Sequence, residues 1–139
     1  MTLQRDTADQ SIAFLVYDSN GDVVTGRTHS NFTATYLRRL KGVPLAASAT
    51  SISLSALGSV NATHSDGGVI EIGSGAYRLD LPDAVTVSGA DSVIITITSN
   101  QSGDAVVFPS TVDIGTDANI RTINDVLITG NGVSPRFGV

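Results

Sequence analysis

Asp80 and Asp83, which flank a proline in the stretch GAYRLDLPDA (75–84), are a candidate catalytic pair. Two carboxylates this close can serve as the general acid and the general base of a hydrolase. Apolar and polar residues alternate through YRLDL, however, so Asp80 is expected to face outward from a strand, and Pro82 suits the first turn of a helix. We therefore expect a strand end and one short helical turn, with Asp83 near the positive end of that turn's dipole.

Other candidate sites are weaker. His29 and His64 are the only histidines, and both lie in polar stretches for which we expect exposed loop side chains. The run D-x-N-x-D (18–22) matches the opening of a calcium-binding loop, but its glycine stands at the fourth place instead of the sixth, and no glutamate occupies the twelfth. A hairpin turn at its Asn-Gly pair, between two strands, explains it more simply. We expect no catalytic residue, no metal and no cofactor.

Composition limits the function classes further. The 139 residues suit one domain, the absence of cysteine excludes disulfides and thiolate zinc sites, and the net charge of −5 argues against nucleic acid as a partner. Arg38, Arg39 and Lys41 form the only basic cluster. No apolar run approaches the length that crosses a bilayer, and MTLQRDTADQ does not resemble a signal peptide. The expectation is synthesis in a cytoplasm and no membrane partner.

The elements that position these residues are expected to be short strands. Segments rich in β-branched residues recur between Gly, Asn, Asp and Pro, with no amphipathic helix of useful length between them. This spacing favours an antiparallel sandwich or barrel over an α/β fold. The predicted strands are 11–18, 32–40, an edge strand within 51–57, 69–72, 77–81, 92–99 and 105–114.

A glycine followed two residues later by a tyrosine indicates which kind of all-β fold to expect. Gly75 stands two residues before Tyr77, which opens a predicted strand. This arrangement resembles the tyrosine corner of immunoglobulin-like sandwiches, where the ring packs inside and the hydroxyl bonds to nearby backbone. The predicted fold is all-β, an antiparallel immunoglobulin-like β-sandwich over residues 11–114. The cysteine pair and the tryptophan of antibody domains are absent, so only the architecture carries over.

The two ends of the chain carry few core-forming signals. Residues 115–139 have too few apolar positions to fold alone, so they either add a strand to their own sheet or lie along another subunit as a C-terminal arm. Residues 1–10 are expected to form an N-terminal arm. The predicted interaction residues are the apolar ones of the two arms: Leu3, Ile120, Ile123, Val126, Leu127, Ile128 and Phe137. Ordinary packing within the chain is the alternative for all of them.

The chain also carries blocks that look like small tailed-bacteriophage virion proteins. The distinctive block is GAYRLDLPDA (75–84), and the others are DSNGDVVTG (18–26), TYLRRLKG (35–42), GADSVIITI (89–97) and IRTINDVLITGNG (120–132). The resemblance implies a non-enzymatic virion structural protein, located in the virion and made in the host bacterial cytoplasm. It implies docking on the particle surface. A capsid decoration (cement) protein is the favoured role, and a tail or baseplate appendage is the alternative.

The same resemblance implies the partners: major capsid or tail proteins, and further copies of this chain in a homo-oligomer such as a trimer. A host-glycan-binding module is the rival hypothesis, for which the polar loop VNATHSDGG (60–68) would supply the ligand groups. A hydrolase using Asp80 and Asp83 is the third. The residues leave open the choice between capsid and tail, the oligomer number and the host.

Overall fold

The computed structural model describes residues 2–4, 7–40, 42–44, 48–87, 90–108, 113–115, 131–132 and 134–135. This part of the chain is built from short strands and two 3₁₀ turns, so the expectation of an all-β protein is confirmed. None of its helices is long and apolar enough to cross a membrane. The elements are β1 (Thr2–Gln4), β2 (Ser11–Tyr17), η1 (His29–Asn31), β3 (Phe32–Leu40), β4 (Thr50–Ile52), β5 (Ser55–Ala56), β6 (Gly68–Gly73), β7 (Ala76–Asp80), η2 (Asp83–Thr86), β8 (Ala90–Ser99), β9 (Ala105–Val107), β10 (Asp113–Gly115), β11 (Asn131–Gly132) and β12 (Ser134–Pro135).

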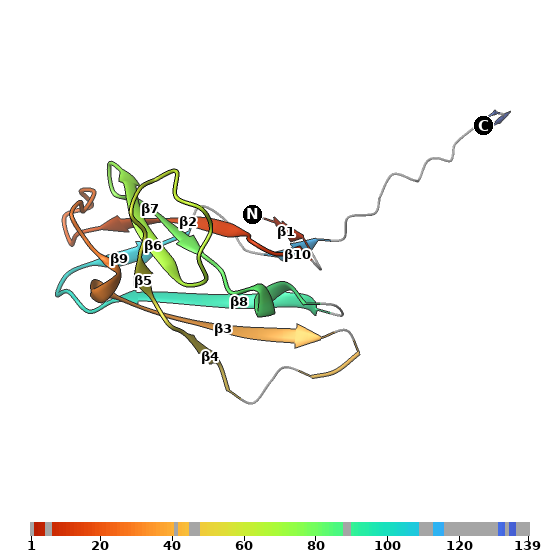
Figure 1. Ribbon diagram of the computed structural model, residues 1–139, viewed down its shortest axis with the longest axis horizontal. Helices are drawn as coiled ribbons and strands as arrows, with labels where there is room; N and C mark the ends of the chain where they lie inside the picture. The colour runs from red at the N-terminus through yellow and green to blue at the C-terminus, as the bar shows by residue number, and fades with distance from the viewer. Residues whose placement is uncertain are drawn as a thin grey trace.

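Most of the strands belong to two five-stranded sheets, which Figure 1 shows as two layers. Sheet A has the order β1-β10-β8-β3-β4, and sheet B has the order β5-β6-β7-β2-β9. Neighbours are antiparallel except β1 with β10 and β5 with β6, which are parallel. β11 and β12 form a separate pair. The domain boundaries predicted after residues 10 and 114 remain predictions. β1 lies in the predicted N-terminal arm, and it pairs with β10, which spans the second predicted boundary.

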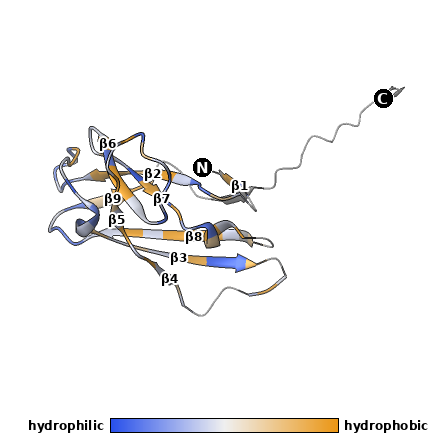
Figure 2. Ribbon diagram, viewed as in Figure 1, coloured by the Kyte–Doolittle hydropathy of each residue, from blue (hydrophilic) through white to orange (hydrophobic). Residues whose placement is uncertain are grey.

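One hydrophobic core lies between the two sheets. Alternate residues of β2 and β7 point into it from sheet B, and alternate residues of β3 and β8 from sheet A, as period-two patterning requires. The aromatic rings at its centre come from both sheets: Phe14 and Tyr77 stack at 5.5 Å, and Phe32 packs edge-on at 5.2 Å and 5.4 Å from them. Figure 2 shows the hydrophobic colouring along the paired strands.

Three expectations about strand connections need correction. The Asn20-Gly21 turn closes only an isolated bridge between Tyr17 and Val23, because β2 and the following strand β3 lie in different sheets. The segment 51–57 overlaps two short strands, β4 and β5, at the edges of opposite sheets. The segment 105–114 likewise splits into β9 in sheet B and β10 in sheet A. In each case the chain crosses from one sheet to the other where one strand or a hairpin had been expected.

Glycine is required at position 67, where the end of the loop after β5 lies close to the backbone of Ser53. The φ of Gly67 is +81°, and a Cβ built there would lie 1.9 Å from the carbonyl oxygen of Ser53. We expect Gly67→Ala to lower the free energy of unfolding by about 3 kcal/mol, through the backbone clash and the unfavourable φ together. Gly103 is the matched control: its φ is +83° but no atom lies within 4 Å of its Cβ position, so Gly103→Ala should cost only about 1 kcal/mol. Urea titrations that gave equal losses for both variants would contradict this account.

Candidate functional site

Asp80 lies in a buried ionic cluster on the outer side of sheet B. Its Oδ1 accepts hydrogen bonds from Arg78 Nε at 2.6 Å and Ser11 Oγ at 2.6 Å, and its Oδ2 accepts from Arg78 Nη2 at 2.9 Å and the Ser65 amide at 3.0 Å. The alternation along β7 does turn this side chain away from the core. The expectation that it is exposed is wrong, however, because the loop 57–67 covers this part of the sheet and leaves Asp80 fully buried.

Arg78 fastens that loop to the sheet. Its Nη1 donates to the carbonyl oxygen of Val60 at 2.9 Å, and its Nη2 donates to that of Ala62 at 3.0 Å. The Gly67 amide donates to the Asp80 carbonyl oxygen at 2.8 Å. The loop proposed for glycan binding therefore uses several of its own backbone groups to hold itself against β7.

The electrostatics of Asp80 do not suit an acid or a base. Burial raises the pKa of this carboxyl, but the hydrogen bonds from Arg78, Ser11 and Ser65 outweigh burial and leave the pKa below its ordinary value of 3.8. The group is therefore an ionised carboxylate at neutral pH. It has no proton to give, and four donors already occupy its two oxygens.

Asp83 is not part of this cluster. It begins η2 and is exposed, and its Oδ1 accepts a hydrogen bond from the Asp9 amide at 3.0 Å. The short helical turn expected here is confirmed, although Pro82 takes the N-cap position instead of the first turn. Because the two carboxylates bind different segments, the structure does not join Asp80 and Asp83 into one acid–base pair.

The histidines are less exposed than expected. The side chain of His64 is only 9% exposed, because it packs between its own loop and residues 9–10. Its Nε2 lies 3.1 Å from the Gln10 carbonyl oxygen, and its Nδ1 lies 3.3 Å from Asp9 Oδ1. His29 is half-buried, and its Nδ1 has no hydrogen-bond partner among the described residues. In that same part of the chain, no three His, Cys, Asp or Glu side chains are grouped as metal ligands would be.

A second ion pair, which the sequence did not reveal, ties the loop after β2 to the turn after β8. Arg27 donates to Asp104 from Nε at 2.7 Å and from Nη2 at 3.0 Å, and Ser99 Oγ donates to the same carboxylate at 2.8 Å. The hydrogen bonds from Arg27 lower the pKa of Asp104 most, followed by that from Ser99. Nothing local in the sequence marks this pair, since the two residues stand 77 positions apart.

Stability is expected to fall in acid. The pKa values of Asp80 and Asp104 are below the ordinary 3.8 in the folded chain, so the stabilisation they give is present above that value and is lost as the pH falls through their folded values. Urea midpoints measured from about pH 7 down to about pH 2 should therefore decline below about pH 4. The variant Asp80→Asn/Asp104→Asn should decline less steeply. A wild-type midpoint that stays constant in acid would contradict the two carboxylates' role.

The carboxylate of Asp18 stabilises the turn formed by residues 18–22. Its Oδ1 accepts hydrogen bonds from the Asn20 amide at 2.8 Å and the Asp22 amide at 3.0 Å. The backbone closes the same turn, with the Asp18 amide donating to the Asp22 carbonyl oxygen at 2.8 Å. The turn expected at the D-x-N-x-D run is confirmed, although it does not join two strands of one sheet.

Tyr77 is buried, and its hydroxyl bonds to backbone as a tyrosine corner would. The hydroxyl donates to the Val24 carbonyl oxygen at 2.9 Å and accepts from the Arg27 amide at 3.2 Å. These partners lie some 50 positions upstream, whereas the sequence pattern predicted nearby backbone. The ring therefore connects sheet B to the 24–27 loop rather than closing a local corner.

The predicted interaction residues fall into two groups. Leu3 is 3% exposed and belongs to the core described above. The others lie outside the described residues: Ile120, Ile123, Val126, Leu127, Ile128 and Phe137.

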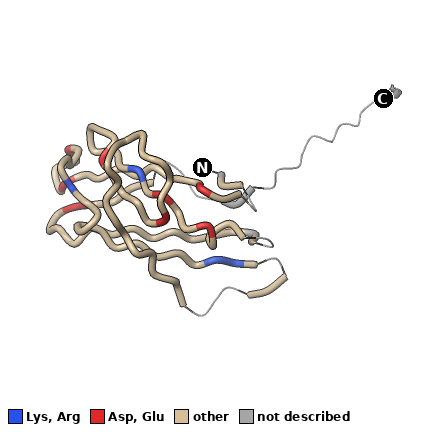
Figure 3. The backbone as a smooth tube through the Cα atoms, in the orientation of Figure 1, with Lys and Arg blue, Asp and Glu red and all other residues tan. Residues whose placement is uncertain are grey.

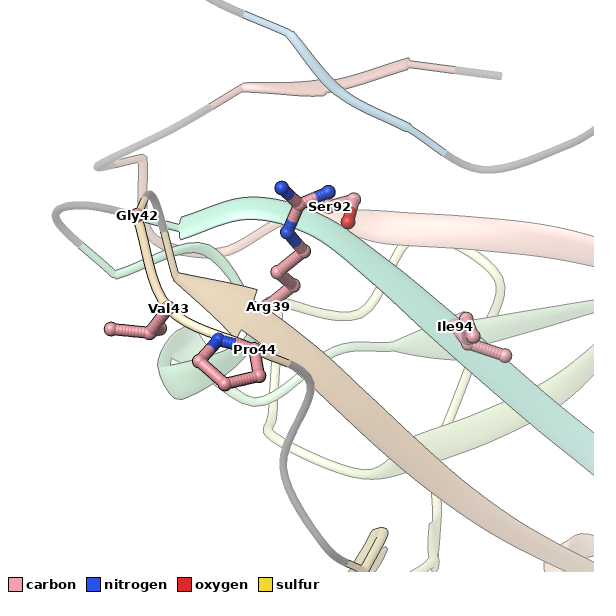
Figure 4. A pocket seen from close by; sticks show the side chains of 6 residues that line it. All are labelled: Arg39, Gly42, Val43, Pro44, Ser92 and Ile94. Carbon is pink, nitrogen blue, oxygen red and sulfur yellow. The ribbon is translucent and has the colours of Figure 1, made fainter.

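A shallow hollow lies at the end of β3, as Figure 4 shows; Arg39, Gly42, Val43, Pro44, Ser92 and Ile94 line its volume of about 680 Å³. Figure 3 shows the basic colouring at this end of β3. Arg38 donates to the Ala84 carbonyl oxygen, and Arg39 is the charged group among the described residues that line the hollow. One guanidinium beside apolar side chains offers a contact surface and no set of convergent catalytic groups.

Comparison of the chain with protein-family models, curated proteins and solved structures gave no match.

Proposed function

We propose that this chain is a non-enzymatic structural protein of a tailed-bacteriophage virion, which docks on the surface of the capsid as a decoration protein. The proposal starts from the resemblance of its sequence blocks to small virion proteins. What the described residues add is the role of the most distinctive block in holding the body together.

The observation that carries the proposal is the use of the polar side chains in GAYRLDLPDA (75–84). Tyr77 holds the 24–27 loop, Arg78 and Asp80 hold the 57–67 loop, and Asp83 holds the residues before β2. Each of these groups binds another segment of the same chain. Because these polar side chains are bonded within the chain, the block contributes to a rigid body, which a particle component needs. The same side chains have little hydrogen-bonding capacity left for a substrate.

We further infer that the two sheets form an immunoglobulin-like sandwich. The inference is supported by the two five-stranded sheets over one core and by the chain crossings between sheets at β4–β5 and β9–β10. A body of this kind presents sheet faces and edges to neighbours.

The test of the function is location in the particle. Phage particles produced by the strain that carries the gene would be banded by density and probed with an antibody against the purified chain, using immunogold electron microscopy. Gold over the heads supports the decoration role. Gold on tails would replace it with the tail or baseplate alternative, and banded particles without the chain would overturn the virion role altogether.

A further inference from the structure

The outer face of sheet B is apolar where no described element covers it. The registers place Leu15 of β2 opposite Val107 of β9 on one side and Ala76 of β7 on the other. Tyr17 and Ala105 form the next pair on the same face, towards the end of β2. We call this surface the apolar face, defined by Leu15, Tyr17, Ile72, Ala76, Ala105 and Val107.

Exposure shows that the described residues leave this face uncovered. Val107 is 42% exposed and Ile72, at the end of β6, is 52% exposed. Val23, bridged to Tyr17 beside the face, is 47% exposed. Large apolar side chains gathered at this exposure are typical of a surface that binds another protein segment.

The rest of the molecule sets the limits of the face. Towards the start of β2, the loop 57–67 lies over Arg78 and Asp80 and ends the open region. The outer face of sheet A is mixed in chemistry: Thr33 pairs with Thr98 and Thr35 with Thr96, and the apolar pair Leu37 with Ile94 follows further along. On the side of sheet B, Val23, Ile72 and Val107 are exposed at one end.

The edge of sheet B is also available beside this face. β9 is the last strand of the sheet in the part of the chain that the structure describes, and it has β2 as its only partner strand there. An added segment could form main-chain hydrogen bonds along β9 while its alternate side chains pack on the neighbouring apolar face. An extended apolar segment is therefore the kind of occupant that the surface fits.

The sequence after β10 offers a candidate for this occupant. Residues 116–130, which lie outside the described residues, have the sequence TDANIRTINDVLITG, with apolar residues at positions 120, 123, 126, 127 and 128. The sheets end at Gly115 of β10, so this segment follows them directly.

The direction of β10 decides between the chain's own face and that of a neighbour. Asp113 pairs with Ser92 in an antiparallel register, so the chain leaves the body near the start of β8. The apolar face lies at the other end, since Tyr17 pairs with Ala105, just after the turn that follows the end of β8. Gly115, the residue before the segment, therefore lies at the end of the body away from the apolar face, which favours a face on another copy.

We propose that residues 116–130 of one copy bind the apolar face and the β9 edge of a second copy. Repeated head to tail, this contact links copies of the chain into a ring or a longer array. The inference rests on the proposed function, for which it supplies the means of self-association. Its test uses the purified full-length chain without any phage particle, so its failure would leave the location experiment untouched.

The test is disulfide cross-linking, which the absence of native cysteine makes clean. One preparation carries Val107→Cys, and a second set carries a single cysteine at position 120, 123, 126 or 128. Mixing the two under mild oxidation should give covalent dimers with at least one partner position. Ile94→Cys replaces Val107→Cys in the control, because Ile94 is 54% exposed on the outer face of sheet A and should give none.

Two outcomes overturn the proposal. In the first, no partner position yields mixed dimers above the Ile94→Cys control. In the second, chains carrying both cysteines close only within one molecule, which would show that the segment covers its own face.

A charge variant gives an independent measurement on the full chain. Ile72→Glu/Val107→Glu changes two exposed side chains, so the fold is expected to survive, as circular dichroism would check. Sedimentation velocity should show self-association weakened about tenfold or more, since binding would bury the new carboxylates without partners. Ile94→Glu is the matched control and should associate as the wild type does. Equal association of all three proteins would overturn the assigned face.

Discussion

Replacing Asp80 by alanine should lower the free energy of unfolding by about 3 kcal/mol. The substitution leaves the Arg78 guanidinium, whose side chain is 17% exposed, without its carboxylate partner, and it removes the acceptor of the Ser11 hydroxyl and the Ser65 amide. Only one loop separates the cluster from water, so we expect a loss near the lower end of that seen for buried ion pairs. The 57–67 loop should loosen with it.

The measurement is a urea titration at neutral pH, joined to amide hydrogen exchange of the 57–67 loop. Asp83→Ala is the control and should cost less than about 1 kcal/mol, because that carboxylate is exposed and accepts one hydrogen bond. Comparable losses for the two variants would contradict the structural role assigned to Asp80. A catalytic activity lost in both variants with unchanged melting would restore the hydrolase hypothesis.

Replacing Tyr77 by alanine should cost about 4 kcal/mol, the largest effect expected for this chain. The ring is fully buried between Phe14 and Phe32, and its removal would leave a cavity where the two sheets meet. The Val24 carbonyl oxygen and the Arg27 amide would also lose their hydrogen-bond partner.

Tyr77→Phe separates the ring from the hydroxyl. It keeps the packing and removes only the two hydrogen bonds, so it should cost about 1–2 kcal/mol. Thermal and urea unfolding of both variants give the comparison. A phenylalanine variant as unstable as the alanine variant would show that the hydroxyl, and not the ring, dominates, while two near-wild-type variants would contradict the central position of Tyr77 in the core.

Much of the local structure could be predicted because it depends on neighbours in the sequence. In β3, Phe32, Ala34 and Tyr36 are buried and the residues between them are not, as a two-residue period requires. The Asp18 turn and the helical turn after Pro82 were predicted from local turn chemistry. Each of these features is decided within a few residues.

The candidate site could not be predicted in the same way. Period-two alternation shows which side of a strand a residue takes, but it does not show what covers that side. Asp80 illustrates the difference: its outward direction followed from the pattern, whereas its burial depends on a loop up to 23 residues upstream, and on Ser11, 69 positions away. His64 was misjudged for the same reason, since residues 9–10 cover it.

Side-chain type and a two-residue period were enough to predict that the described part of the chain is all-β and where most of its strands run. The sheet that each short strand joins depends on tertiary packing, which places β4 and β5, like β9 and β10, in opposite sheets. Tertiary packing also decided the partners of Arg27, Tyr77 and Asp80, since those contacts form only after the two sheets have closed over one core. Strand pairing is a choice among distant segments with similar local preferences, and long-range packing makes that choice.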